Sequence, residues 1–131
     1  MNSGIELSAE EISSFKEQGF LRLDQFLAPD EVAWVRGVYD RLFAERVGWN
    51  RGDQFDLAGT DEPGAQARLP QLMNPAAYAP ELTQAEFRQR ALSLAHQLLG
   101  ADAEPGDEHA ILKPAENGVE TPWHQDQAYW D

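Results

Sequence analysis

The spacing of the apolar residues changes along the chain, from mainly helical spacing before Gly106 to mainly alternating spacing after it. Apolar residues three and four apart indicate amphipathic helices, whereas alternation with a period of two indicates strands. Helices that precede strands, rather than alternating with them, are typical of an α+β domain with an antiparallel sheet. We therefore expect residues 1–131 to form an α+β structure whose sheet only begins near the end of the chain.

Two helices are predicted in the first third of the chain by their boundary residues. Ser8 and Glu11 form a capping-box pattern, which predicts a helix from about Ala9 to Gln18 that ends at Gly19. Pro29 suits the first turn of a second helix, because its fixed φ and missing N–H are both tolerated there. The buried stripe of this second helix is expected to consist of Val32, Val35, Tyr39, Leu42 and Phe43.

A third helix is predicted after a segment, residues 47–80, that is rich in Gly, Pro and Asp and is expected to form loops. Thr83 and Glu86 give a second capping-box pattern, and Gly100 is expected to end the helix. The apolar face of this helix is expected to contain Phe87, Ala91, Leu94, Ala95 and Leu98.

Short strands are predicted from alternation and from residues that favour extended backbone. We expect strands at Phe20–Leu23, Ala67–Leu72 and Ala110–Leu112, and a longer aromatic-rich strand at Thr121–Trp130. A turn is expected at Pro114–Gly118, between the last two strands. A hairpin of two strands is marginal alone, so the sheet would need further strands to be stable.

Composition excludes several classes of protein. The formal net charge of −13 argues against a nucleic-acid partner and against an anionic membrane surface, because both need clustered Lys and Arg. The chain has no Cys, which excludes disulfides, zinc–thiolate sites and cysteine nucleophiles. Its first residues show no basic patch followed by an apolar run, and no segment has the length of a membrane span, so a cytoplasmic location is expected.

The residues that indicate chemistry are His124 and Asp126, in the sequence Trp-His-Gln-Asp. Side chains two apart on a strand face the same way, so an imidazole and a carboxylate could reach one metal ion. Two His and one carboxylate on one face of an octahedron are typical of non-haem Fe(II) oxygenases, because they leave positions open for cosubstrate and O2. A bare His-x-Asp is common by chance, and on spacing alone an ordinary polar strand edge is the better interpretation.

The surrounding sequence resembles the phytanoyl-CoA dioxygenase family. The run 111–130 has an apolar strand ending in Lys-Pro, a turn with Gly, and then Pro-Trp-His-Gln-Asp, which is similar to the segment that carries the first iron ligands in that family. Upstream, Gly19–Leu23 and Phe26–Glu31 are also similar to the family. The resemblance covers nearly the whole chain, and its specific part is the His-Gln-Asp region.

The resemblance implies a non-haem Fe(II), 2-oxoglutarate-dependent dioxygenase that hydroxylates an unactivated C–H bond of a small organic or acyl substrate. In such an enzyme His124 and Asp126 are metal ligands, while Arg68, His109 and Gln125 approach the cosubstrate. The implied fold has N-terminal helices packed on the first strands of a double-stranded β-helix, a jelly-roll core of the cupin type. O2 and the small-molecule substrate are the partners it implies, with no nucleic acid and no membrane.

Each residue also has a simpler structural interpretation. Arg68 and Lys113 could be solvated surface charges, and His109 could be a hydrogen-bonded strand histidine. His96 is expected to be a packing or surface residue of the third helix. The aromatic residues near the motif are expected to line a core or a pocket rather than take part in catalysis, and they are Trp123, Tyr129 and Trp130.

The family's remaining site residues, a second His and an Arg that pairs with 2-oxoglutarate, lie well downstream of His-x-Asp. Only five residues follow Asp126, so neither is present in this sequence. We therefore expect residues 1–131 to be the N-terminal part of a single domain, truncated and inactive alone. The alternatives are a non-catalytic cupin-like binding or structural module and a non-catalytic fragment that packs against another chain. The sequence does not identify the substrate or the oligomeric state.

Overall fold

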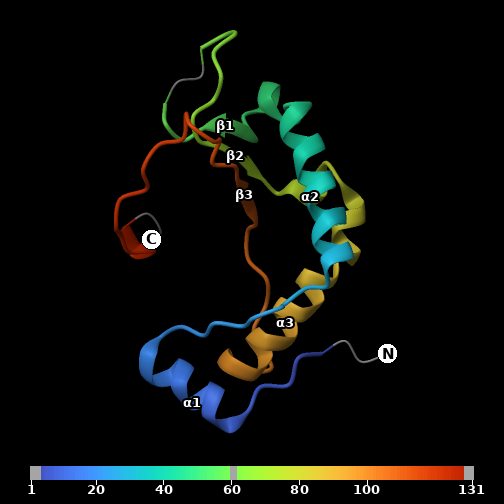
Figure 1. Ribbon diagram of the computed structural model, residues 1–131, viewed down its shortest axis with the longest axis vertical. Helices are drawn as coiled ribbons and strands as arrows, with labels where there is room; N and C mark the ends of the chain where they lie inside the picture. Colours follow the sequence, from blue (N-terminus) through green and yellow to red (C-terminus); the bar gives the residue numbers. More distant parts are fainter. Residues whose placement is uncertain (1–3, 60–61, 129–131) are drawn as a thin grey trace.

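The computed structural model describes residues 4–59 and 62–128, which form three α-helices, several short 3-10 helices and a small antiparallel sheet (Figure 1). In chain order the elements are α1 (Ala9–Gln18), α2 (Pro29–Ala44), the short 3-10 helix η1 (Trp49–Arg51), β1 (Gln54–Asp56), β2 (Pro70–Met73), η2 (Pro75–Ala77), η3 (Pro80–Gln84), α3 (Glu86–Leu99), β3 (His109–Ile111) and η4 (Asp126–Ala128). The α+β class predicted from the sequence is confirmed.

The sheet has the order β1-β2-β3, with β2 between two antiparallel neighbours. Leu72 lies opposite Gln54 on one side and Ala110 on the other, so these three side chains share a face. That face is buried, since Leu72 is fully enclosed, whereas Ile111 on the other face is half-exposed. In Figure 1, α2 lies to the right of the sheet and the chain after β3 runs down its left side.

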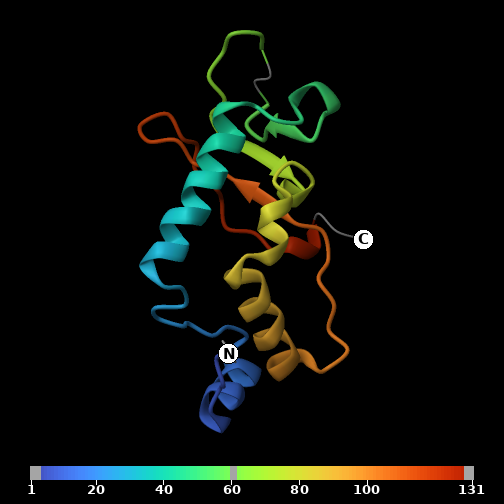
Figure 2. The ribbon, with the colours of Figure 1, turned by 90° about the vertical axis from the view of Figure 1, so that its right-hand side faces the viewer.

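The core lies where α2, β2 and η3 meet. Leu42, Leu72 and Leu82, one from each of these elements, are completely buried. Val38 and Ala79 complete the buried cluster, and partly buried aromatic residues pack around it. Figure 2 shows α1 at the end of the molecule opposite the sheet, away from this core. Burial of a leucine side chain contributes about 2–3 kcal/mol, so these three positions dominate the apolar stabilisation.

A polar network joins α2 to α3 and to the chain just before β3. The Tyr39 hydroxyl donates to Glu108 Oε1 at 3.3 Å, and the Arg88 guanidinium pairs with the same carboxylate. Partial burial of the ring, together with the negative charge of Glu108, raises the pKa of Tyr39 to about 12. The hydroxyl therefore stays protonated and remains a donor throughout the neutral pH range.

Helix α1 begins and ends as predicted. The Ser8 hydroxyl accepts from the Glu11 backbone N–H, and the Glu11 carboxylate accepts in return from the Ser8 N–H at 2.7 Å. Gly19 follows the helix with φ of 82°, a left-handed conformation that glycine adopts without strain. The capping box and the glycine stop are both confirmed.

Acidification is expected to loosen the first turn of α1. Hydrogen bonds from the backbone and hydroxyl of Ser8 lower the pKa of Glu11, so the carboxylate stabilises the helix above its unfolded pKa and loses this effect as the pH falls through the lowered value. The exchange rate of the Ile12 amide relative to its intrinsic rate at the same pH, measured from pH 6 down to about pH 3, should rise through that window. In Ser8→Ala the rise should shift to higher pH, and an unchanged midpoint would contradict the cap.

Helix α2 begins at Pro29 as predicted, but its buried stripe is only partly correct. Leu42 is buried, and Tyr39 and Phe43 pack against the core. Val32 was expected inside and is 42% exposed, whereas Val38, which the prediction omitted, is buried. The first turns of α2 extend beyond the sheet (Figure 2), and its two buried residues, Val38 and Leu42, both lie in its C-terminal half.

The N-cap of helix α3 is Ala85, two residues after the predicted cap, Thr83. Thr83 lies in η3, where its hydroxyl donates to the Pro80 carbonyl, so the predicted capping box is wrong. The Glu86 backbone N–H is instead satisfied by the Glu31 carboxylate of α2, at 2.7 Å. Gly100 ends the helix as predicted. The predicted apolar face of α3 is less buried than expected, because no α3 residue is fully buried and only Phe87 packs against the core.

The strand predictions have mixed outcomes. Residues Phe20–Leu23 form no strand, and Phe20 is 63% exposed. The strand expected at Ala67–Leu72 is β2, which begins three residues later, and the one at Ala110–Leu112 is β3. The segment 47–80 was expected to be loops, but it contains β1 as well. Pairing with distant segments decides which extended stretches become strands, and that information is not local.

Candidate metal centre

The chain between β3 and η4 carries the predicted metal ligands. It turns at residues 115–117, where the Asn117 N–H donates to the Ala115 carbonyl at 2.7 Å. Gly118 is required here, because a Cβ at this position would lie 2.8 Å from the Pro114 carbonyl oxygen. Lys113 Nζ then donates to Thr121 Oγ1 at 3.2 Å and closes the loop. The turn predicted at Pro114–Gly118 is thus confirmed.

The strand predicted at Thr121–Trp130 is wrong for the residues that the structure describes. Residues 121–125 are irregular, and residues 126–128 form η4. The predicted strand's last positions, with Tyr129 and Trp130, lie outside the described residues. Trp123 was expected to line a core or pocket, but it is fully exposed. Strand alternation is therefore not what orients the side chains of this segment.

The backbone orients the imidazole of His124. Its Nδ1 lies 2.8 Å from the carbonyl oxygen of Pro122. A carbonyl oxygen can only accept, so this contact requires a proton on Nδ1, and in the neutral ring the lone pair is then on Nε2. Histidine ligands in metalloproteins commonly have this arrangement, in which a backbone carbonyl fixes the tautomer and the ring orientation.

Asp126, the first residue of η4, meets that lone pair. Its Oδ1 lies 3.4 Å from Nε2 of His124. Both atoms are acceptors in the neutral-imidazole state, so the approach is favourable only with a proton or a metal cation near both. Adjacent ligands of an octahedral ion with bonds of about 2.1 Å are about 3 Å apart, close to the observed separation. The pair therefore fits two neighbouring metal positions.

The two predicted ligands lie at the surface, with their side chains 38% and 83% exposed for His124 and Asp126. Across residues 4–59 and 62–128, no group of three His, Cys, Asp or Glu side chains is arranged to hold a metal. Two protein ligands leave most of an octahedral coordination sphere to other donors. Within the described chain, His124 and Asp126 therefore form an exposed pair and not a complete metal site.

The other predicted site residues lie elsewhere. Gln125 is exposed between the two ligands. Arg68 lines a depression of about 390 Å³ beside the 115–118 turn, with Gln66 among its neighbours. His109 is the first residue of β3 and borders another depression of about 440 Å³, which is formed by α3 and by the chain at residues 104–109. The structure thus brings the two predicted metal ligands together and places Arg68 and His109 in two separate depressions.

Sequence reasoning missed the buried carboxylate of Asp56. Its Oδ1 accepts from the backbone N–H groups of Ala58 and Leu69, at 3.0 and 2.9 Å, and its Oδ2 accepts from the N–H of Arg68 at 3.0 Å. The only local signal is the turn pattern Asp-Leu-Ala-Gly, where the Gly59 N–H bonds the Asp56 carbonyl. This side chain connects the loop before β2 to β1.

No helix in the described chain is long and apolar enough to cross a membrane.

Comparison with known proteins identifies a family and several relatives. The family model described as Phytanoyl-CoA dioxygenase (PhyH) matches residues 15–131. Ectoine dioxygenase of Bordetella parapertussis is 27% identical over 124 residues, which cover 95% of this chain and 38% of the relative. Ectoine dioxygenase of Streptomyces anulatus is 23% identical, covering 95% and 40%. The chain thus spans about two fifths of these relatives. No solved structure matches it.

Proposed function

The chain belongs to the phytanoyl-CoA dioxygenase family, and on that premise we propose that it carries part of the active site of an Fe(II), 2-oxoglutarate-dependent dioxygenase. His124 and Asp126 are proposed as two of the iron ligands. The observation that supports this most directly is the 3.4 Å approach of Nε2 to Oδ1, with the opposite ring nitrogen committed to Pro122. This is the arrangement that an imidazole–carboxylate metal pair needs.

The proposed reaction is hydroxylation of an unactivated C–H bond. When bound, Fe(II) with 2-oxoglutarate and O2 supplies the oxidising chemistry. The chain's own contribution is to hold the imidazole in the correct tautomer and to set the carboxylate beside it. A further ligand and a cover that excludes water would come from beyond the described residues, in a jelly-roll core of which residues 1–131 form the N-terminal part.

The cosubstrate and the substrate are proposed more broadly. Gln125, Arg68 and His109 are proposed to approach 2-oxoglutarate once such a core is complete. The substrate is proposed to be a small organic or acyl molecule. Ectoine, named in the relatives, is the first compound to test, and it favours the small-molecule side of that proposal.

Anaerobic titration of Fe(II) into the 131-residue protein tests this function without requiring turnover. We expect paramagnetic broadening of NMR signals from residues 122–126, with an affinity that rises about tenfold or more when 2-oxoglutarate is present, because a chelating 2-oxo acid fills two open positions. Succinate, which lacks the oxo group, should give no such rise. In His124→Ala both the broadening and the effect of 2-oxoglutarate should disappear.

The matched control is His96→Ala, which removes an exposed imidazole on α3 and should leave the titration unchanged. Iron binding that is indifferent to 2-oxoglutarate would rule out the dioxygenase assignment and leave an ordinary metal site. Broadening that survives in His124→Ala would rule out the site itself.

A further inference from the structure

A depression of about 410 Å³ lies between the C-terminal end of α2, the buried face of the sheet and the chain after β3. We call it the α2 cleft. Its walls are largely apolar and include Phe43, Trp49, Pro70, Leu112 and Pro114. Small-molecule sites are commonly clefts of this size, with apolar walls and a few convergent polar groups. None of the five residues proposed for iron or cosubstrate lines it.

The first polar group of the cleft is Arg46, which is held in a conformation that favours glycine. The Val47 N–H donates to the Leu42 carbonyl and the Arg46 N–H to the Phe43 carbonyl, which is the pattern that ends a helix with a left-handed residue. Arg46 has φ of 49°. A non-glycine residue in this region is strained, and such strain is concentrated at functional sites.

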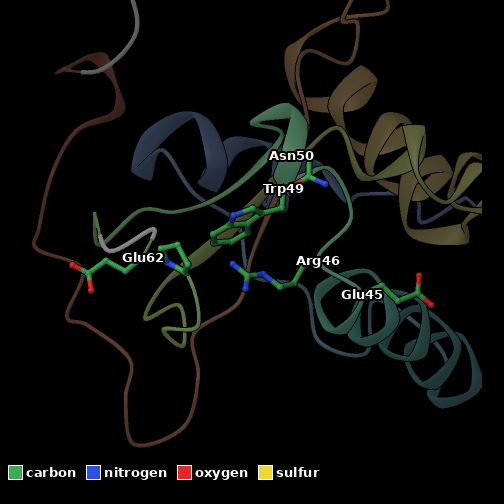
Figure 3. Close-up of a pocket in the computed structure, with 6 residues that line it drawn as sticks. Glu45, Arg46, Trp49, Asn50 and Glu62 are labelled. Carbon is green, nitrogen blue, oxygen red and sulfur yellow. The ribbon is translucent and has the colours of Figure 1, made fainter.

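The guanidinium of Arg46 lies over the indole of Trp49, 3.6 Å from the ring centroid, so its position is fixed by stacking. Figure 3 shows this approach, with the carboxylates of Glu45 and Glu62 pointing away from it. Within the described residues, the Arg46 side chain makes no hydrogen bond and no ion pair. The chain has 23 acidic and 10 basic residues, so carboxylate partners for an arginine are abundant. The guanidinium N–H groups of Arg46 are nevertheless unused within the described part of the chain and can donate hydrogen bonds to a ligand.

The second polar group is Gln54, which lines the cleft and is 2% exposed. Its Oε1 is buried and accepts no hydrogen bond from the residues that the structure describes. A buried acceptor without a donor costs about 1–3 kcal/mol. The last torsion of a glutamine side chain is broad, so the amide can turn toward a donor that enters the cleft.

We propose that the α2 cleft binds a small organic acid that has an apolar, preferably aromatic, body and one hydroxyl or amine. The carboxylate pairs with Arg46, because a guanidinium donates two parallel N–H bonds to such a group. The hydroxyl or amine donates to Gln54 Oε1 and supplies its missing partner. The body lies against Phe43 and Leu112. Asp40, at the rim, disfavours a second negative charge.

Three probes separate these features in an NMR titration of the metal-free protein with EDTA present. They are para-hydroxyphenylacetate, phenylacetate, which lacks the donor, and para-cresol, which lacks the carboxylate. We expect saturable shifts at the Trp49 indole and the Gln54 side-chain amide for the first probe. Phenylacetate should bind at least about threefold more weakly than para-hydroxyphenylacetate, because it loses a neutral hydrogen bond. Para-cresol should bind at least about tenfold more weakly, because it loses a charge-assisted hydrogen bond.

Two variants assign the contacts. Arg46→Gly should lower the affinity for para-hydroxyphenylacetate about tenfold or more. The Tm of this variant should stay the same or rise, because glycine adopts the left-handed conformation without strain. Gln54→Met should make para-hydroxyphenylacetate and phenylacetate bind equally. Arg36→Ala, which removes an exposed arginine of the same helix, should change nothing.

Several outcomes would overturn this site. They are absence of saturable binding by para-hydroxyphenylacetate, wild-type affinity in a folded Arg46→Gly variant, and displacement of the probe by 2-oxoglutarate, which has no apolar body. None of them bears on iron binding at His124, so the two proposals stand or fall separately.

Discussion

Asp56→Ala is expected to lower the free energy of unfolding by about 3 kcal/mol, because three backbone N–H groups lose a charged acceptor together. The carboxylate is 3% exposed and bonds the N–H groups of Ala58, Arg68 and Leu69. Water can replace only part of this, since the loop closes over the site. Urea unfolding followed by circular dichroism measures the loss, and small domains have only about 5–15 kcal/mol in total.

Asp56→Asn makes the prediction specific. An amide keeps one acceptor oxygen, which can still serve Ala58 and Leu69, but its NH2 faces the N–H of Arg68, so an intermediate loss is expected. Asp107→Ala removes an exposed carboxylate and is expected to change stability by less than about 0.5 kcal/mol. Equal effects at positions 56 and 107 would show that the carboxylate does not hold the loop.

Leu42→Ala is expected to lower the free energy of unfolding by about 2–5 kcal/mol, because the side chain is completely buried and its removal leaves a cavity beside Leu72 and Leu82. In a domain of this size such a loss approaches the total free energy of unfolding, so the variant is expected to be partly unfolded at 25 °C. The midpoint of urea unfolding, at an unchanged m value, reports it.

A matched pair on the same helix tests whether burial in α2 is placed correctly. Val38→Ala removes two buried methyl groups and is expected to cost about 1–3 kcal/mol. Val32→Ala makes the same change at an exposed position and should stay within about 0.5 kcal/mol. The reverse order would mean that α2 packs through its N-terminal half.

The metal pair shows how local and tertiary information combine. The sequence placed His124 and Asp126 together by strand alternation, yet the described segment is not a strand. The two side chains still meet, since the Pro122 carbonyl orients the ring and η4 begins at Asp126. Residues only two apart remain close in most backbone conformations, so the prediction of proximity did not depend on the prediction of secondary structure. Arg68 and His109 lie far from this segment in sequence, and their placement needed the fold.

By itself, the sequence determined the features that depend on neighbouring residues: the Ser8 cap, the glycine ends of α1 and α3, the start of α2 at Pro29, and the turn before Thr121. These follow from backbone sterics and from hydrogen bonds within a few residues. Family membership was also determined, because the motif and its surroundings are contiguous.

Only the tertiary structure decided which apolar and polar groups are buried. Val32 and Val38 are the same residue type on one helix, and the position of the sheet alone separates them. Glu31 caps α3 although 55 residues separate it from Glu86. Gln54 and Asp56 are polar residues in a segment that was predicted to form loops, yet both are buried. Burial depends on which distant elements pack together, and no local propensity encodes that.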